Sequence, residues 1–249
     1  ASYGLDKAIF GYGSTGSVVS MSNLISNIGV MASDVTGVGS ARREIAAANY
    51  GTDKAIFGYG DTGSIVSLTN LVSSSGVVAS DTTGVGTARQ GLAAVGYGVD
   101  LAIFGYGRTT SAQASKSSIT NKVSNTGIVA TDTTGVGTAR YDLAATRYGV
   151  GLAIFAYGNP QDSATGISNK VSNTGVVASD VAGVGTARHV LAATSYGGDK
   201  GIFGYGNDGD TGNVGMTNLV SNTGVIAADV TGVGEARSAL AAAGYSTSA

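Results

Sequence analysis

The sequence contains no cysteine and no tryptophan, and it has only one histidine, one proline and two glutamates among its 249 residues. The lack of cysteine excludes disulfides, thiol catalysis and cysteine-ligated zinc sites. Charged residues make up 12% of the chain, and 14 basic residues nearly balance 16 acidic ones, which does not fit a nucleic-acid-binding surface. No apolar run approaches the roughly 18 residues of a membrane span, and the first residues lack a signal-peptide pattern.

Glycine is the most conspicuous residue that is present, with 41 copies. An apolar fraction of 43% and a single proline fit neither a disordered chain nor collagen, so we expect a packed core. Nothing in the composition indicates a cofactor or a metal, and we predict neither. We likewise expect no nucleic-acid partner and no membrane insertion.

The chain is built from five repeats. The motif Ala-Ile-Phe-Gly-Tyr-Gly begins at Ala8, Ala55 and Ala102, and it recurs with one change from Ala153 and from Gly201. A second motif, Gly-Val-Gly-x-Ala-Arg, ends at five arginines, and an aliphatic-Ala-Ala segment follows three residues after each of them. Such self-similarity predicts a repeat architecture. The repeats span about 3–49, 50–96, 97–147, 148–195 and 196–244, which form one domain.

All variation in repeat length falls in one segment. From tyrosine to tyrosine the repeats are 47, 47, 51, 48 and 49 residues long, and 39 residues remain in each when the segment after Gly-Tyr-Gly is removed. Insertions of this kind map to loops on one face of a repeat protein. The five variable loops are 14–21, 61–68, 108–119, 159–167 and 207–216.

The local patterns predict strands rather than helices. The apolar runs are short, rich in β-branched and aromatic residues, and bounded by Gly, Asp, Asn or Thr. A repeat of 47 to 51 residues accommodates roughly four short strands. We therefore predict an all-β, five-bladed β-propeller with four-stranded antiparallel blades. We expect the strand 240–245 to pair beside the N-terminal strand 7–13 and to close the ring. An open stack or β-solenoid is the alternative, but neither shorter rungs nor capping repeats are visible.

The succession Gly-Val-Gly-Thr-Ala-Arg, Leu-Ala-Ala-x-x-Tyr-Gly, Ala-Ile-Phe-Gly-Tyr-Gly, a variable loop and Thr-Asn-x-Val-Ser-Asn-Thr-Gly resembles the kelch repeat over the whole chain. The sequence departs from that pattern because Gly-Tyr-Gly replaces the glycine pair and the late aromatic residue is missing. The resemblance implies a kelch-like propeller. The Tyr-Gly and Leu-Ala-Ala arrays are also similar to those of tailed bacteriophages and bacterial surface proteins, which implies an extracellular surface or a virion as the location.

Two residues recur once per repeat and are interpreted as structural. Each aspartate can cap its own Asp-Thr-Thr-Gly-like turn, and each arginine can bind backbone carbonyls or the repeated aspartate. The alternatives are a metal or glycosidase site made by the aspartates and an axial anion site made by the arginines. The residues are Asp34, Asp81, Asp132, Asp180 and Asp229, and Arg42, Arg89, Arg140, Arg188 and Arg237.

The candidate ligand-binding residues lie in or beside the variable loops. One tyrosine precedes each loop by one glycine, and an aromatic ring with a polar tip suits a sugar or peptide, although packing between blades is the alternative. The candidates are Tyr12, Tyr59, Tyr106, Tyr157, Tyr205, Arg108, Asp61, Asp208 and Asp210.

Three further motifs are weaker. Gly-x-Gly-x-x-G occurs at 11–16 and 58–63, but a dinucleotide site needs a helix after it, and none is predicted. His189 is the only imidazole, and its unlike counterparts in other repeats indicate a solvent-facing position without a catalytic role. The segment 207–211 is rich in oxygen ligands but lacks the length and the final Glu of an EF-hand loop, so we expect a solvated turn.

These features favour a protein that is not an enzyme. We predict a recognition or structural module that binds a glycan or a protein through its variable loops and that belongs to a phage particle or cell-surface assembly. A multivalent lectin with equivalent sugar sites between blades is the alternative, and a hydrolase is a more distant one. Because a propeller hosts many functions, the fold alone does not choose among them.

Overall fold

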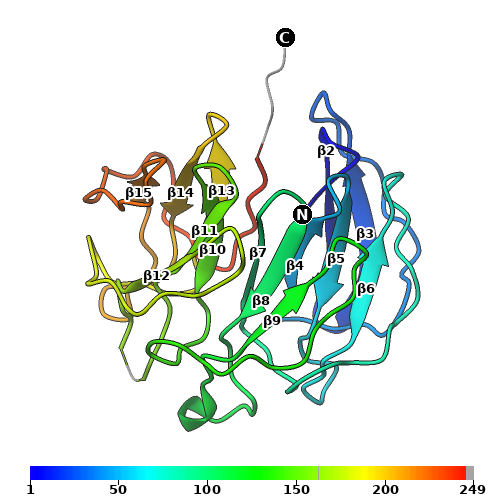
Figure 1. Cartoon of the computed structure of the whole chain (residues 1–249), viewed down its shortest axis with the longest axis horizontal. Coiled ribbons are helices and arrows are strands. Elements are labelled where there is room, and N and C mark those ends of the chain that lie inside the picture. The colour runs from blue at the N-terminus through cyan, green and yellow to red at the C-terminus, as the bar shows by residue number, and fades with distance from the viewer. Residues whose placement is uncertain (162, 245–249) are drawn as a thin grey trace.

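The computed structural model describes residues 1–161 and 163–244, which form five antiparallel sheets of three strands each around a common axis (Figure 1). Sheet 1 contains β1 (Ser2–Tyr3), β2 (Lys7–Ser14) and β3 (Val18–Ile25), and sheet 2 contains β4 (Ala46–Tyr50), β5 (Lys54–Gly58) and β6 (Thr69–Val72). Sheet 3 contains β7 (Ala93–Tyr97), β8 (Leu101–Gly105) and β9 (Thr120–Val123), and sheet 4 contains β10 (Ala144–Tyr148), β11 (Leu152–Ala156) and β12 (Ser168–Val171). Sheet 5 contains β13 (Ala192–Tyr196), β14 (Lys200–Gly204) and β15 (Thr217–Val220), and a 3-10 helix, η1, covers Gln113–Ser115.

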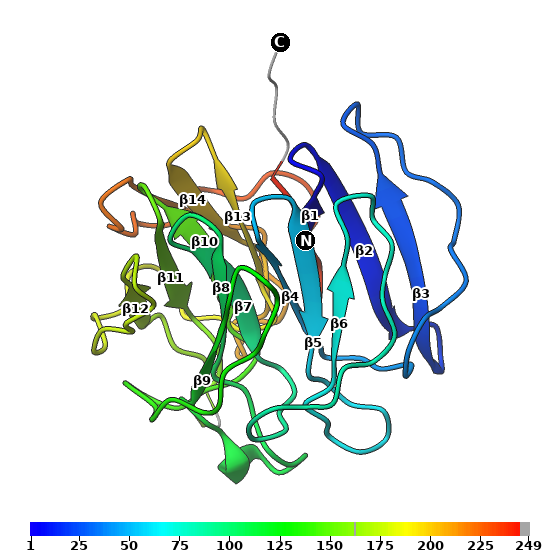
Figure 2. The same ribbon diagram turned by 45° about the vertical axis from the view of Figure 1, so that its right-hand side comes forward.

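The five repeated antiparallel sheets confirm the all-β, propeller-like architecture that the repeats predicted (Figure 2). The middle strands are buried on both faces, as in Lys54–Gly58, where four of the five residues are buried. Sheets 2, 3 and 4 are each covered on both sides by their neighbours, which explains why their middle strands are continuously apolar rather than alternating. Among the described residues, no helix is long and apolar enough to cross a membrane.

The innermost strands are built from small residues. The strands β4, β7, β10 and β13 lie next to one another and, with the first residues of the chain, line an axial cavity of about 130 Å³. Alanine supplies the lining of each strand at Ala47, Ala94, Ala145 and Ala193. Crowding at the axis therefore accounts for the aliphatic-Ala-Ala segment of each repeat.

The blades have three strands, and the prediction of four was wrong. The expected fourth strand of sheet 2 pairs with β6 only at two isolated bridges, Val72 with Val78 and Thr69 with Thr82. The two positions are three residues apart on β6 and four apart on the outer segment, so the outer segment has one extra residue, which forms a bulge. That bulge contains Asp81, whose carboxylate accepts a hydrogen bond from Ser40 of the preceding repeat.

Closure of the ring by the segment 240–245 is not seen. Residues 240–244 form no strand, and Tyr245 lies outside the described residues. The inner edge of β2 is taken by the chain's first residues instead, because Ser2 pairs with Ala8 and Tyr3 with Lys7. Within the described residues, a core cluster fills each of the four successive interfaces from sheets 1 and 2 to sheets 4 and 5, and none joins sheet 5 to sheet 1.

Candidate functional site

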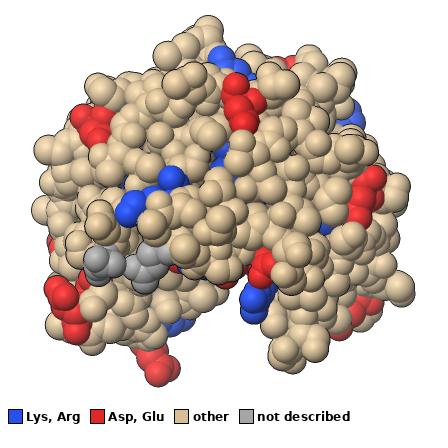
Figure 3. Space-filling view, turned by 90° about the horizontal axis from the view of Figure 1, so that it is seen from below, with Lys and Arg blue, Asp and Glu red and all other residues tan. Residues whose placement is uncertain are grey.

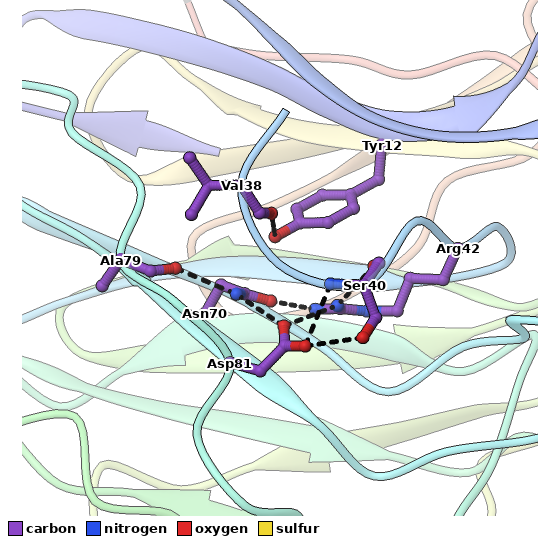
Figure 4. Close-up of polar contacts among 7 residues, drawn as sticks. All are labelled: Tyr12, Val38, Ser40, Arg42, Asn70, Ala79 and Asp81. Atoms are coloured by element: carbon purple, nitrogen blue, oxygen red, sulfur yellow. Dashed lines mark hydrogen bonds and ion pairs between the residues drawn. The ribbon is translucent and has the colours of Figure 1, made fainter. Parts of the chain in front are cut away.

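The repeated arginine joins each sheet to the next. Between sheets 1 and 2, the guanidinium of Arg42 lies 4.4 Å from the ring centre of Tyr12, donates to Ser40 O at 3.1 Å, and donates to Asn70 Oδ1 (Figure 4). Asn70 in turn donates to Ala79 O and to Asp81 Oδ1, both at 2.9 Å. We call this set of tyrosine, arginine, asparagine and aspartate the inter-sheet clamp.

The clamp repeats at three further interfaces. Its arginines are completely buried, and they lie 4.2 to 4.9 Å from the ring centres of their tyrosines. The further members are Tyr59, Arg89, Asn121 and Asp132; Tyr106, Arg140, Asn169 and Asp180; and Tyr157, Arg188, Asn218 and Asp229. An axial ring of guanidinium groups is therefore not formed by these arginines, which lie between the sheets.

Three of the five repeated tyrosines are inside the protein rather than at a loop rim, and Tyr12 and Tyr205 are half-buried. Tyr59, Tyr106 and Tyr157 are completely buried, and each ring packs edge-on or tilted against the phenylalanine of the next sheet at about 5 Å. Their hydroxyls donate to a valine carbonyl of the Gly-Val-Gly turn, as do those of Tyr12 and Tyr205. Burial raises the pKa of Tyr59 and Tyr106 to about 12. This placement gives them the packing role that was the alternative to ligand binding.

The repeated aspartates cap a turn, but not their own. Asp132 accepts hydrogen bonds from the backbone N and the hydroxyl of Thr87, which belongs to the preceding repeat. Asp81, Asp180 and Asp229 do the same with Ser40, Thr138 and Thr186. Burial alone would raise the pKa of these carboxyls, but the hydrogen bonds outweigh it and the net pKa is lowered. The prediction that each aspartate caps a turn of its own repeat was therefore wrong: these four aspartates hold two repeats together rather than stabilising one.

The asparagine of the clamp was missed in the sequence. Asn70, Asn121, Asn169 and Asn218 are completely buried and form the link between arginine and aspartate. The signal was present, since a Ser/Thr-Asn pair occurs in every repeat at a fixed distance from the aspartate. A buried amide with both a donor and an acceptor partner is well suited to joining a cation to an anion.

The non-repeating polar residues gather instead at one end of the axis. The residue two positions after each clamp arginine has a positive φ of 50 to 60°, and its N donates to the carbonyl of its counterpart one repeat earlier. These bonds link Glu44, Gly91, Asp142, Val190 and Ala239 in order, at 2.7 to 3.2 Å. A left-handed conformation is a genuine outlier for valine. Here the left-handed conformation of Val190 is held by tertiary contacts, and Gly91 is the one residue at this position of the repeat that indicates such a conformation in the sequence.

These five residues surround a hollow of about 310 Å³, which we call the axial hollow. The aliphatic residue that follows each of them, such as Leu92 or Leu143, completes the lining. Two carboxylates face it, Glu44 and Asp142. The acidic residues are not equivalent, because Arg108 Nη2 donates to Glu44 Oε2 at 3.1 Å whereas Asp142 has no ion pair among the described residues. Burial first, and the charge of Glu44 second, raise the pKa of Asp142 to about 6, against a smaller opposing effect of Arg108.

Four variable loops begin beside this hollow. Isolated bridges join their first residues to the residue that directly follows each clamp arginine: Arg43 with Asp61, Gln90 with Arg108, Tyr141 with Asn159, and His189 with Asn207. The loop that contains η1 is at the bottom of Figure 1, and Figure 3 views that end of the molecule. Lysine, arginine, aspartate and glutamate are scattered over this face without a continuous patch of one sign, and its outline is notched at one edge.

Arg108 and Asp61, both predicted as ligand-binding, lie at this face in ion pairs. The guanidinium of Arg108 stacks on the Tyr141 ring, 4.7 Å from its centre, and forms an ion pair with Glu44. When the Gln90 amide is oriented with its oxygen toward Arg108, Nε and Nη2 of Arg108 donate to that oxygen at 3.0 and 3.2 Å. Asp61 is nearly buried and accepts from Arg43 Nε at 3.2 Å and Nη2 at 3.1 Å. These contacts hold the loops in place beside the axial hollow.

The remaining candidates are separate from the hollow. Asp208 accepts from the backbone N of Asp210, Thr211 and Gly212 and from the Thr211 hydroxyl, and this set of bonds, the hydroxyl foremost, lowers the pKa of Asp208 to about 2. Asp210 is exposed in the same turn. His189 is half-buried rather than solvent-facing, and its Nδ1 has no partner in the described part of the chain. No group of three or more metal-ligating side chains occurs among residues 1–161 and 163–244.

A likeness to a known protein is found in the fold and not in the sequence. No protein-family model matches the sequence, and no curated protein matches it. The structure is similar to that of YjhT, a kelch-repeat propeller protein, with a TM-score of 0.71 at 9% sequence identity, over 96% of this chain and 84% of the YjhT chain. The likeness supports the kelch-like, propeller-like arrangement of tandem repeats and shows nothing about activity.

Proposed function

We propose that the protein is a non-enzymatic recognition module that binds a glycan or a protein partner at the face around the axial hollow. The observation behind this proposal is that repeated and variable residues of each unit lie in different places. The repeated polar residues bond to one another in the clamps between sheets, whereas the residues that differ between repeats surround one hollow. Small-molecule sites in proteins combine an apolar lining with a few convergent polar groups, and here Leu92 and Leu143 stand beside Glu44 and Asp142.

The multivalent lectin with equivalent sites between blades gains no support. The space between adjacent sheets at the level of the clamp is filled by completely buried arginine, asparagine and phenylalanine side chains. A single site on the axis is the arrangement that the side chains favour. Membership of a phage particle or cell-surface assembly, and an extracellular or virion location, stay predictions that rest on the sequence resemblance alone.

A screen of soluble glycans tests the proposal, with the wild-type protein, Asp142→Asn and Arg108→Gln measured side by side. We expect a bound ligand to lose at least tenfold in affinity in both variants. Asp53→Asn serves as the control, because Asp53 is partly exposed in the turn between β4 and β5, at the opposite end of the inner strand, and it should bind normally. Binding that survives in both hollow variants would place the site elsewhere. Where no glycan binds, a protein partner released by the same two variants would support the proposal.

Hydrolysis is the second candidate, because one observation favours it. A carboxylate pair acts as acid and base only when different environments separate the two pKa values, and here Arg108 pairs with Glu44 while Asp142 has a pKa of about 6. Turnover of chromogenic glycosides that is lost in Asp142→Asn and kept in His189→Ala would establish a hydrolase at the hollow. Turnover lost in His189→Ala would point to the histidine instead.

We further propose that the ring closes between sheets 5 and 1 by a fifth clamp. Sheet 5 carries Tyr205 with Arg237 stacked on its ring at 4.0 Å, and sheet 1 carries Asn23 bonded to Asp34 at 2.7 Å. Each half lacks what the other supplies. Arg237 is exposed, whereas its counterparts in the other repeats are completely buried, and within the described residues Asp34 lacks the bonds to a preceding turn that the other aspartates make. Closure would complete the wall of the axial hollow at Ala239.

A further inference from the structure

The residue before each inner-strand tyrosine lies at one register on the axis, at the end opposite the axial hollow. These residues are Ser2, Asn49, Gly96, Arg147 and Ser195, and all of them line the axial cavity. Arg147 is the only side-chain cation among the described lining residues. The repeats therefore place a single guanidinium where the other positions carry small or neutral groups.

Arg147 has no acidic partner. Its Nη2 donates to Gly98 O at 3.0 Å, and no carboxylate of the described chain lies within ion-pair distance of it. The guanidinium is partly buried, and burial alone lowers its pKa, without a contribution from any acid. A guanidinium has five donors in a fixed fork, so most of them are left for another partner. An unpaired, partly buried cation is costly unless an anion compensates it.

Space for an anion adjoins Arg147. Besides the axial cavity, Arg147 lines a hollow of about 430 Å³ at this end of the axis, which we call the far hollow. Ser195 lines both spaces. Four glycines of the inner turns, Gly98, Gly149, Gly151 and Gly198, keep side chains out of the far hollow, and Asp199 is the one carboxylate of the described residues on its wall.

We propose that Arg147, assisted by the Ser195 hydroxyl, binds a small carboxylate in the far hollow. The planar fork of arginine matches a carboxylate in a bidentate manner, and such bonds are the strong ones. Asp199 on the same wall disfavours a dianion such as phosphate, because like charges repel. This site is separate from the axial hollow and does not depend on the proposed function.

Titration of the melting temperature with sodium acetate tests the site, with sodium phosphate and sodium chloride compared at the same ionic strength. We expect a saturable rise for acetate, a smaller one for phosphate and none for chloride, since a ligand that binds only the folded state stabilises it. In Arg147→Asn the rise with acetate should vanish. That variant should fold, because Asn49 occupies the same position in β4. Arg43→Asn, an exposed arginine at the other end, should behave as wild type.

A second measurement follows the side-chain Nε resonance of Arg147 during the acetate titration. A shift that saturates together with the melting temperature supports the site. Wild-type protein without a saturable rise, or an equal rise in Arg147→Asn, overturns the proposal. Phosphate binding as tightly as acetate would show that Asp199 does not select the ligand.

Discussion

Asp81 of the second repeat closes a turn of the first: its Oδ2 accepts hydrogen bonds from the backbone N of Ser40 at 2.9 Å and from the Ser40 hydroxyl at 2.6 Å. The contact joins residues 41 positions apart. Because Asn70 ties the same carboxylate to Arg42, the turn, the arginine and the neighbouring sheet form one unit. The stability of the ring is therefore carried by interfaces rather than by single sheets, as in other repeat proteins.

Replacing the capping aspartate should destabilise the protein. In Asp132→Ala the backbone N and hydroxyl of Thr87 and the amide of Asn121 lose their acceptor. We expect a loss of about 1–3 kcal/mol, the usual contribution of hydrogen bonds to a charged group. Urea denaturation measures it. Asp210→Ala removes an exposed loop carboxylate and should change the free energy of unfolding little; equal losses in the two variants would contradict the clamp.

The same aspartates predict sensitivity to acid. Their pKa values are lowered in the folded protein from the ordinary 3.8, so the stabilisation is present above that pH and is lost as the pH falls below it toward the folded values. Melting temperatures between pH 5 and pH 2 should therefore drop steeply below about pH 4. The drop should be shallower in Asp132→Asn, and an identical slope in that variant would argue against the assignment.

Truncating a clamp arginine should cost more than removing an exposed cation. Arg140 donates to Tyr157 O at 2.8 Å, Thr138 O at 3.0 Å and Asn169 Oδ1 at 2.7 Å from a completely buried position. Arg140→Ala leaves these acceptors without a donor and leaves a cavity where the side chain packed, at a cost of about 3–5 kcal/mol. Lys54→Ala is the control with an exposed cation, because the side chains of Lys54 and its partner Asp53 are 44% and 36% exposed, and exposed ion pairs contribute less than about 1 kcal/mol.

Asp142 predicts the opposite dependence on pH. Its pKa is raised to about 6, so the folded protein holds this proton more tightly than the unfolded chain does. Stability should therefore fall as the pH rises from about 4 to 6 and stay lower above it. Asp142→Asn removes the penalty and should stabilise the protein at pH 7.5 by up to about 3 kcal/mol. Unchanged or reduced stability of this variant would show that the carboxylate is needed in its ionised form.

The architecture could be predicted from the repeat pattern because each repeated motif is explained by one structural requirement. The aliphatic-Ala-Ala segment is small at the axis, as at Ala47 and Ala94, and the Gly-Tyr-Gly tyrosine packs on the next sheet. The number of strands per blade could not be predicted in this way. The outer segment of each sheet meets its neighbour at only two isolated bridges, with a bulge between them, and no local signal in the sequence specifies that bulge.

The candidate site was harder to predict for a related reason. Repetition directs attention to residues that recur, whereas Glu44 and Asp142 occur at one position of the repeat where the others have Gly91, Val190 and Ala239. Their significance comes from the series of four backbone bonds that brings residues of five repeats to one end of the axis. Arg108 and Asp61 were named as candidates because they stand in the variable loops, which begin at that face, and their role in binding stays a prediction.

Closure of the ring can be decided by comparing equivalent substitutions at a formed clamp and at the proposed one. Asp132 caps the turn before sheet 3, and Asp34 is its counterpart in sheet 1, where it is exposed and bonded only to Asn23. If sheets 5 and 1 join in solution, Asp34→Ala and Arg237→Ala should each destabilise the protein by about 1–3 kcal/mol, like Asp132→Ala. The double variant should then lose less than the sum of the two single losses, because both residues serve one interface.

Removal of residues 240–249 should also lower the melting temperature if the ring closes, because Ala242, Ala243 and Gly244 line the axial cavity. Near-neutral effects of all these changes would mean that the ring stays open between its first and last sheets.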